Sequence, residues 1–186
     1  MFGIRVVAGA FVVVAALTAC GGPVSSPGPA STSPATTSSS AAVQPSGTSA
    51  VAAPEQLKFT AKTVDGKDIS GADLAGKPVV LWFWAPWCPK CQREAPGMAA
   101  AAEKHGEKVT FLGVAALDQV PAMQQFVQRY GLQSFQHVAD VDSSVWKRFG
   151  VTAQPAYAFI GTSGQVELVT SQLSEQDLAQ RLSRLA

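Results

Sequence analysis

Two cysteines separated by two residues are the part of this chain most able to do chemistry. Cys88 and Cys91 follow the apolar run 79–85, which predicts a buried strand, and precede residues that predict a helix. On the first turn of a helix their Cα atoms lie within about 7 Å, so the two thiols can close a disulfide. Unpaired backbone N–H groups and the helix dipole favour a thiolate at Cys88. A thiolate that attacks disulfides, beside a second thiol that resolves the mixed disulfide, predicts a redox enzyme.

The elements that must position this pair follow from the apolar pattern. Strands are predicted over 57–63, 67–69, 79–85, 109–115, 135–139, 157–160 and 166–169. Helices are predicted over 88–104, 120–130, 143–149 and 175–185. Asp65-Gly66 and residues 161–164 sit between paired strands as hairpin turns. This order predicts an α/β fold with a mixed central sheet and helices on both faces.

The N-terminal residues predict export. Residues 1–19 have a basic start and an apolar run shorter than the roughly 20 residues that span a bilayer, which is typical of a secretory leader. They run into Leu17-Thr18-Ala19-Cys20, which resembles a bacterial lipobox. We therefore expect a lipoprotein signal peptide and a lipidated Cys20; the alternative is an ordinary cleaved leader with a chance cysteine. With three cysteines in the chain, this leaves one pair for chemistry.

A second composition shift separates a tether from a folded domain. After Cys20, residues up to 54 are dominated by Ser, Thr, Ala, Pro and Gly and contain no charged or aromatic residue. Such a segment buries too little apolar surface to fold, so residues 20–54 are interpreted as a disordered tether. Residues 55–186 have the usual length of one domain. The formal net charge is +1, without a basic stripe, so nothing indicates nucleic-acid binding.

The segment 83–96 carries a family resemblance. Phe83-Trp84-Ala85-Pro86-Trp87-Cys88-Pro89-Lys90-Cys91, followed by Glu94 and Pro96, resembles the thioredoxin fold family. It is similar to the exported TlpA/ResA/DsbE branch, which favours W-C-x-x-C-x-x-E-x-P. With the lipobox and tether, it looks like the mycobacterial-type DsbF or DsbE-like lipoproteins of that branch.

The resemblance implies a role for each matching residue. Cys88 would be the exposed nucleophile and Cys91 the more buried resolving thiol, with no cofactor beyond their redox-active disulfide. Pro155, after Gln154, would be the loop proline whose peptide bond is cis, and Trp87 would pack beside the disulfide. Pro96 would bend the active-site helix. The expected supporting residues of the site are Trp87, Pro89, Lys90, Glu94, Gln154 and Pro155.

One position departs from thioredoxin itself. Thioredoxin carries a buried carboxylate six residues before its first cysteine, and Trp82 stands there in this chain. Glu94 either replaces this proton acceptor or is only a carboxylate favoured by the helix dipole. Lys90 either stabilises a thiolate at Cys88 or is a solvated surface charge. Trp82, Trp84 and Trp146 are interpreted as core residues.

Other chemistries fit these residues less well. A zinc site needs about four ligands, and the domain adds only the distant His105 and His137, which are interpreted as surface or turn residues. A thioredoxin-like peroxidase would carry its reactive cysteine in a T-x-x-C setting, which the chain lacks. A Sco-like copper chaperone would use C-x-x-x-C and a later histidine near the Pro155 loop.

We therefore expect an extracytoplasmic enzyme that forms disulfides in exported proteins. The alternative uses the same chemistry in reverse, as a reductase in cytochrome c maturation. Expected partners are exported proteins that contain cysteines and a membrane redox partner that recycles the disulfide. The expected location is the extracytoplasmic face of the cell membrane, with a lipid anchor and a monomeric domain.

Overall fold

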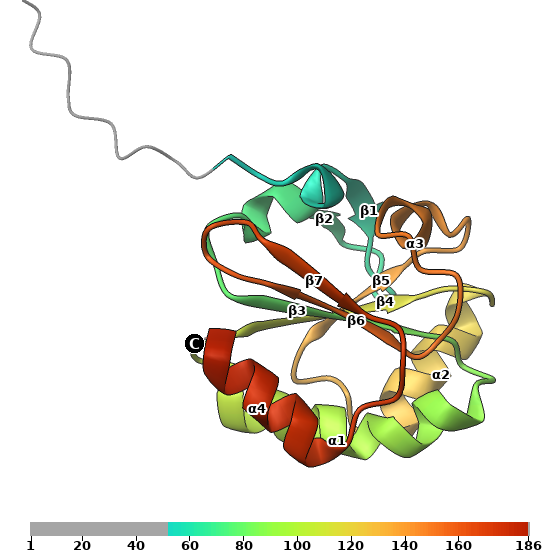
Figure 1. Ribbon diagram of the computed structural model, residues 1–186. Coiled ribbons are helices and arrows are strands. Elements are labelled where there is room, and N and C mark those ends of the chain that lie inside the picture. Colours follow the sequence, from blue (N-terminus) through green and yellow to red (C-terminus); the bar gives the residue numbers. More distant parts are fainter. Residues whose placement is uncertain (1–51, 186) are drawn as a thin grey trace, which may run out of the picture. The chain divides into compact units, whose positions relative to one another are not determined.

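Described residues of the computed structural model run from 52 to 185, and they form a five-stranded sheet (Figure 1). The strand order is β5-β4-β3-β6-β7. β3 (Val79–Trp84), β4 (Thr110–Ala115) and β5 (Gln136–Ala139) are parallel. β6 (Ala156–Ile160) pairs antiparallel with β3, and β7 (Val166–Val169) pairs antiparallel with β6. The predicted α/β class with a mixed sheet is confirmed.

Helices cover both faces of this sheet. α1 (Pro89–His105), α2 (Val120–Arg129) and α4 (Glu175–Leu185) pack against one face (Figure 1). The other face carries α3 (Ser144–Arg148), the short 3-10 helices η1 (Glu55–Leu57) and η2 (Gly71–Leu74), and the first hairpin. That hairpin consists of β1 (Thr60–Lys62) and β2 (Asp68–Ser70). Helices on both faces are therefore also confirmed.

The central strand β3 divides its side chains between the two cores. Successive residues of a strand point to opposite faces, and all six residues of β3 are buried. Val80, Trp82 and Trp84 lie in the core under α1, α2 and α4. Trp84 stacks on Phe126 of α2 with ring centroids 4.3 Å apart. Trp146 is buried in the opposite core, so the interpretation of Trp82, Trp84 and Trp146 as core residues is confirmed.

The first hairpin covers the outer edge of β5. Gly66, with φ of +80°, forms its turn, and Thr63 forms a β-bridge to Val138 of β5.

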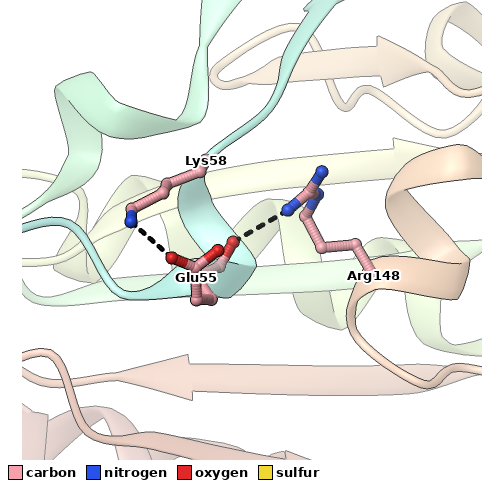
Figure 2. Close-up of polar contacts among 3 residues, drawn as sticks. All are labelled: Glu55, Lys58 and Arg148. Carbon is pink, nitrogen blue, oxygen red and sulfur yellow. Dashed lines mark hydrogen bonds and ion pairs between the residues drawn. The ribbon is translucent and has the colours of Figure 1, made fainter.

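On the same side of the domain, η1 is fixed by polar contacts (Figure 2). The ammonium group of Lys58 pairs with the Glu55 carboxylate, and Arg148 Nη1 donates to the Glu55 carbonyl oxygen at 3.0 Å.

His137 corrects the expectation that both histidines are surface or turn residues. It lies in β5, is 2% exposed, and has its Nε2 3.0 Å from the Leu132 carbonyl oxygen. The ring occupies the space beside Gly113, its partner on β4. A Cβ at Gly113 would lie 2.0 Å from His137 Nδ1, so the glycine makes room for the imidazole. The sequence pattern missed this pairing because it joins two strands.

The predicted leader, Cys20 and most of the tether lie outside the described residues. Within residues 52–185, no helix has the length and apolar character needed to cross a bilayer.

The predicted strand and helix positions differ from the observed ones by a few residues at most. α1, for example, begins at Pro89 because Cys88 is its N-cap, and it continues through Pro96 to His105.

Candidate active site

The two cysteines lie where β3 passes into α1. β3 ends at Trp84, a short loop follows, and Cys88 caps the N-terminus of α1 with Pro89 in the first helical turn. The Cys91 backbone N–H donates to Cys88 Sγ, with N and S 3.4 Å apart. Both cysteines are free thiols. The fold thus places the Cys88 sulfur at the end of the helix where backbone donors are unpaired.

Cys88 is less exposed than the resemblance implied. It is 4% exposed, and Cys91 is fully buried. The expectation of an exposed nucleophile is therefore wrong in degree, although Cys88 is the more accessible of the two. The cause is the cap itself, because the Cys88 side chain turns back over the helix to accept the Cys91 N–H.

Pro155 lies beside the strand end that leads to Cys88. The Gln154–Pro155 peptide bond is cis, as the resemblance implied. Pro155 is buried and Gln154 half-buried, directly before β6. Because Phe83 pairs with Ala156 in the antiparallel register, Pro155 lies at the same end of the sheet as Trp84.

Trp87 presents an indole ring to solvent. It is 53% exposed, and its Nε1 donates to the Leu117 carbonyl oxygen at 3.0 Å. Leu117 follows β4, is 48% exposed, and has φ of +61°, a conformation that non-glycine residues seldom adopt. The loop after β4 thus holds the indole, which the sequence did not indicate. Pro89 and Lys90 are exposed on the first turn of α1.

Glu94 is a buried carboxylate on the second turn of α1. It is 8% exposed; its Oε1 accepts the Leu173 N–H at 3.1 Å, and its Oε2 has no hydrogen-bond partner among the described residues. Burial raises the pKa of Glu94, an effect that the nearby Tyr157 hydroxyl, the Leu173 N–H and the Trp82 indole partly oppose. Trp82 Nε1 itself has no hydrogen-bond partner within residues 52–185. Glu94 is therefore an enclosed carboxylate with a raised pKa.

Cys91 and Tyr157 complete a buried titratable cluster with Glu94. The pKa of the Cys91 thiol is raised, first by burial, then by its hydrogen bond with Cys88 and by the negative charges of Cys88 and Glu94. The pKa of Tyr157 is raised by burial and by the negative charge of the nearby Glu94. Sequence reasoning missed Tyr157; the available signal was its place in the strand that follows Pro155, two residues further along.

Glu94 supplies a buried carboxylate that the β3 position of Trp82 does not. Trp82 fills the β3 position where thioredoxin has its carboxylate, and it is fully buried. The carboxylate near Cys91 comes instead from Glu94 on α1. A buried acid whose pKa is raised can exchange a proton with a thiol whose pKa is also raised. Within residues 52–185 there is no group of three His, Cys, Asp or Glu side chains arranged to hold a metal.

Known proteins resemble this chain in sequence. The chain matches the AhpC/TSA family over residues 52–169. It is 45% identical to the soluble secreted antigen MPT53 of Mycobacterium tuberculosis, over 73% of this chain and 79% of the relative. It is 33% identical to the thiol-disulfide oxidoreductase ResA of Halalkalibacterium halodurans, over 66% of this chain and 70% of the relative.

Solved structures agree with these relatives. A structure of DsbF from M. tuberculosis in mixed oxidised and reduced forms is 54% identical, with a TM-score of 0.70, and covers 72% of this chain and 99% of its own. A secreted M. tuberculosis disulfide oxidoreductase homologous to Escherichia coli DsbE is 42% identical, with a TM-score of 0.68, and covers 72% of this chain and 100% of its own. The chain therefore belongs to the AhpC/TSA family of thioredoxin-like proteins, and it is a thiol-disulfide oxidoreductase.

Proposed function

We propose that this oxidoreductase introduces disulfides into exported proteins that contain cysteines. A substrate thiolate attacks Cys88 of the oxidised enzyme; a bond forms between these sulfurs, the Cys88–Cys91 bond breaks, and Cys91 leaves as a thiolate. A second substrate thiolate attacks the substrate sulfur of this mixed disulfide and releases Cys88 as a thiolate. Two electrons pass from the substrate to the enzyme, and a membrane redox partner takes them up to restore the disulfide.

The place of the Cys88 sulfur at the N-terminus of α1 is the observation that supports this direction. There it accepts the Cys91 N–H, with N and S 3.4 Å apart. This hydrogen bond and the helix dipole stabilise negative charge on the sulfur when Cys88 is released. Stabilising the reduced enzyme in this way makes its disulfide a stronger oxidant.

Glu94 would donate a proton to the Cys91 sulfur or accept one from it. When Cys91 leaves as a thiolate, its raised pKa favours protonation, and Glu94, whose pKa is also raised, can supply the proton in its protonated form. In the reverse direction, ionised Glu94 accepts the Cys91 proton so that Cys91 can attack the mixed disulfide. Glu94 therefore serves either direction of exchange.

A reductase in cytochrome c maturation is the second candidate. The full burial of Cys91 beside Glu94 supports this direction as well, because a working dithiol must lose the Cys91 proton before Cys91 can resolve a mixed disulfide. A Sco-like copper chaperone is a remote third candidate; a chain that releases Cu(I) on dialysis would dismiss it.

The reduction potential of the full chain separates the two directions. Equilibration in glutathione buffers can be followed by fluorescence, since Trp87 is half-exposed beside the cysteines. DsbA and thioredoxin bracket the range at about −120 and −270 mV. A value near the first supports the oxidase, and a value at or below the second supports the reductase. Full oxidase activity in Cys88→Ser would refute the oxidase assignment.

We also propose that the protein is exported and anchored by a lipid on Cys20. The motif Leu17-Thr18-Ala19-Cys20 supports this, whereas the relative MPT53 is described as soluble and secreted. Palmitate labelling of the chain, with Cys20→Ser as the control, tests it. Label and membrane association that both disappear in the variant support the anchor; an unlabelled chain in the medium contradicts it. The domain is expected to be monomeric, which sedimentation checks.

A further inference from the structure

A cavity lies on one side of Glu94. Its volume is about 220 Å³, and it is bounded by α1, by the start of β6 and by the segment that enters α4. At about 30 Å³ per water molecule, it has room for several. Neither cysteine lines the cavity, and neither Trp87 nor Pro155 does. The cavity is therefore lined by none of the residues expected to face a substrate at Cys88.

The Glu94 carboxyl group lines this cavity and also has one oxygen enclosed in the protein. Its Oε1 accepts the N–H of Leu173, and both residues line the cavity. Its Oε2 is enclosed and has no hydrogen-bond partner among residues 52–185. A carboxyl group placed in this way can take up a proton on the inner side and release one on the cavity side.

A second carboxylate lies at the outer part of the cavity. Glu175, the first residue of α4, is exposed and lines the cavity together with Gly97 of α1. A Cβ at Gly97 would lie 3.4 Å from Glu175 Cγ and 3.5 Å from its Oε1, so the Glu175 side chain lies over Gly97. The other charged or titratable groups around Glu94 are Arg93, Cys91 and Tyr157.

We propose that this cavity is the proton route of the enzyme, by which Glu94 exchanges protons with solvent while a substrate covers Cys88. The proposal rests on the proposed role of Glu94. In the resolving step, Cys91–SH gives its proton to Glu94, and the Cys91 thiolate attacks Cys88. The Cys88–Cys91 bond forms, the bond from Cys88 to the substrate breaks, and the substrate leaves as a thiolate. Glu94 then releases the proton to water in the cavity and, past Glu175, to solvent.

The test fills the cavity and follows single-turnover kinetics of the full chain with a disulfide-containing peptide. Gly97→Phe adds a side chain at a position where the atoms nearest to a Cβ, among the described residues, all belong to the flexible Glu175 side chain. We expect release of the substrate thiol to slow about tenfold, less than the ~100-fold expected for loss of the acid–base group itself in Glu94→Gln. The solvent deuterium isotope effect on that step should rise. Attack of Cys88 on the peptide should keep its rate.

A matched control distinguishes a route from a disturbed helix. Ala100→Phe puts the same ring on the same helix, but Ala100 is exposed and lines a neighbouring cavity between α1 and α4. It should leave the resolving step unchanged. The reduction potential of Gly97→Phe should equal that of the natural chain, because a proton route changes rates and not equilibria.

The outcomes of these experiments distinguish the cavity route from the role of Glu94. A resolving step of normal rate in Gly97→Phe, with Glu94→Gln slow, overturns the cavity route and leaves the role of Glu94 intact. A normal rate in Glu94→Gln overturns the role of Glu94, and the route with it. If Gly97→Phe does not fold, Glu175→Gln replaces it: slower resolution at neutral pH supports the route, and an unchanged rate and isotope effect overturn it.

Discussion

His137 should make the stability of the domain depend on pH in a way that one substitution removes. Burial lowers the pKa of the folded imidazole to about 4, from an ordinary value of 6.5. Between these two pH values the unfolded chain binds more protons than the folded one. The free energy of unfolding must therefore fall as the pH falls from 6.5 toward 4. The loss approaches about 3 kcal/mol at pH 4, from the difference between the two pKa values at 1.36 kcal/mol for each pH unit.

The assay is urea unfolding at several pH values between 4 and 7, with His137→Gln as the matched variant. Glutamine can still donate to the Leu132 carbonyl oxygen that His137 Nε2 contacts, yet it does not titrate. Glu94 has a raised pKa and contributes the opposite slope as its buried carboxyl ionises with rising pH. This contribution cancels in the difference between the two chains. A difference in unfolding free energy that stays constant from pH 7 to pH 4 would refute the reasoning.

Three further outcomes are expected. Cys91→Ser should accumulate the mixed disulfide between Cys88 and the substrate, visible on non-reducing gels; a chain that accumulates none contradicts the assigned roles. Glu94→Gln should slow thiol exchange by about 100-fold, measured by stopped-flow fluorescence, and Glu103→Gln, an exposed change on the same helix, should not. Gly113→Ala should cost about 1–3 kcal/mol in urea unfolding, because its Cβ would collide with the His137 ring; an unaltered midpoint would contradict the packing.

The order of elements and the position of the redox pair could be predicted because both depend on local pattern. The continuous apolar run of β3 indicates a central strand, and Cys88 followed by Pro89 indicates the start of a helix. The cis bond at Pro155 came from the family resemblance alone. Nothing in a dipeptide of Gln and Pro distinguishes the two isomers.

The burial and contacts of several site and core residues depend on long-range packing, which could not be predicted from the sequence. Glu94 lies near the start of α1, where an exposed carboxylate would be ordinary, and its enclosure involves Leu173, 79 residues along the chain. His137 resembles a surface residue until Gly113 of the neighbouring strand makes room for it. The contact of Trp87 with Leu117 joins two loops that only the parallel sheet brings together. Each depends on a partner that local periodicity does not reveal.

The bridge between Thr63 and Val138 bears on aggregation. An open strand edge offers unpaired N–H and C=O groups to any extended chain that meets it. The first hairpin covers this edge of β5. At the other edge, β7 is short and carries the charged Glu167. Both edges of the sheet thus discourage the strand addition by which exposed sheets aggregate.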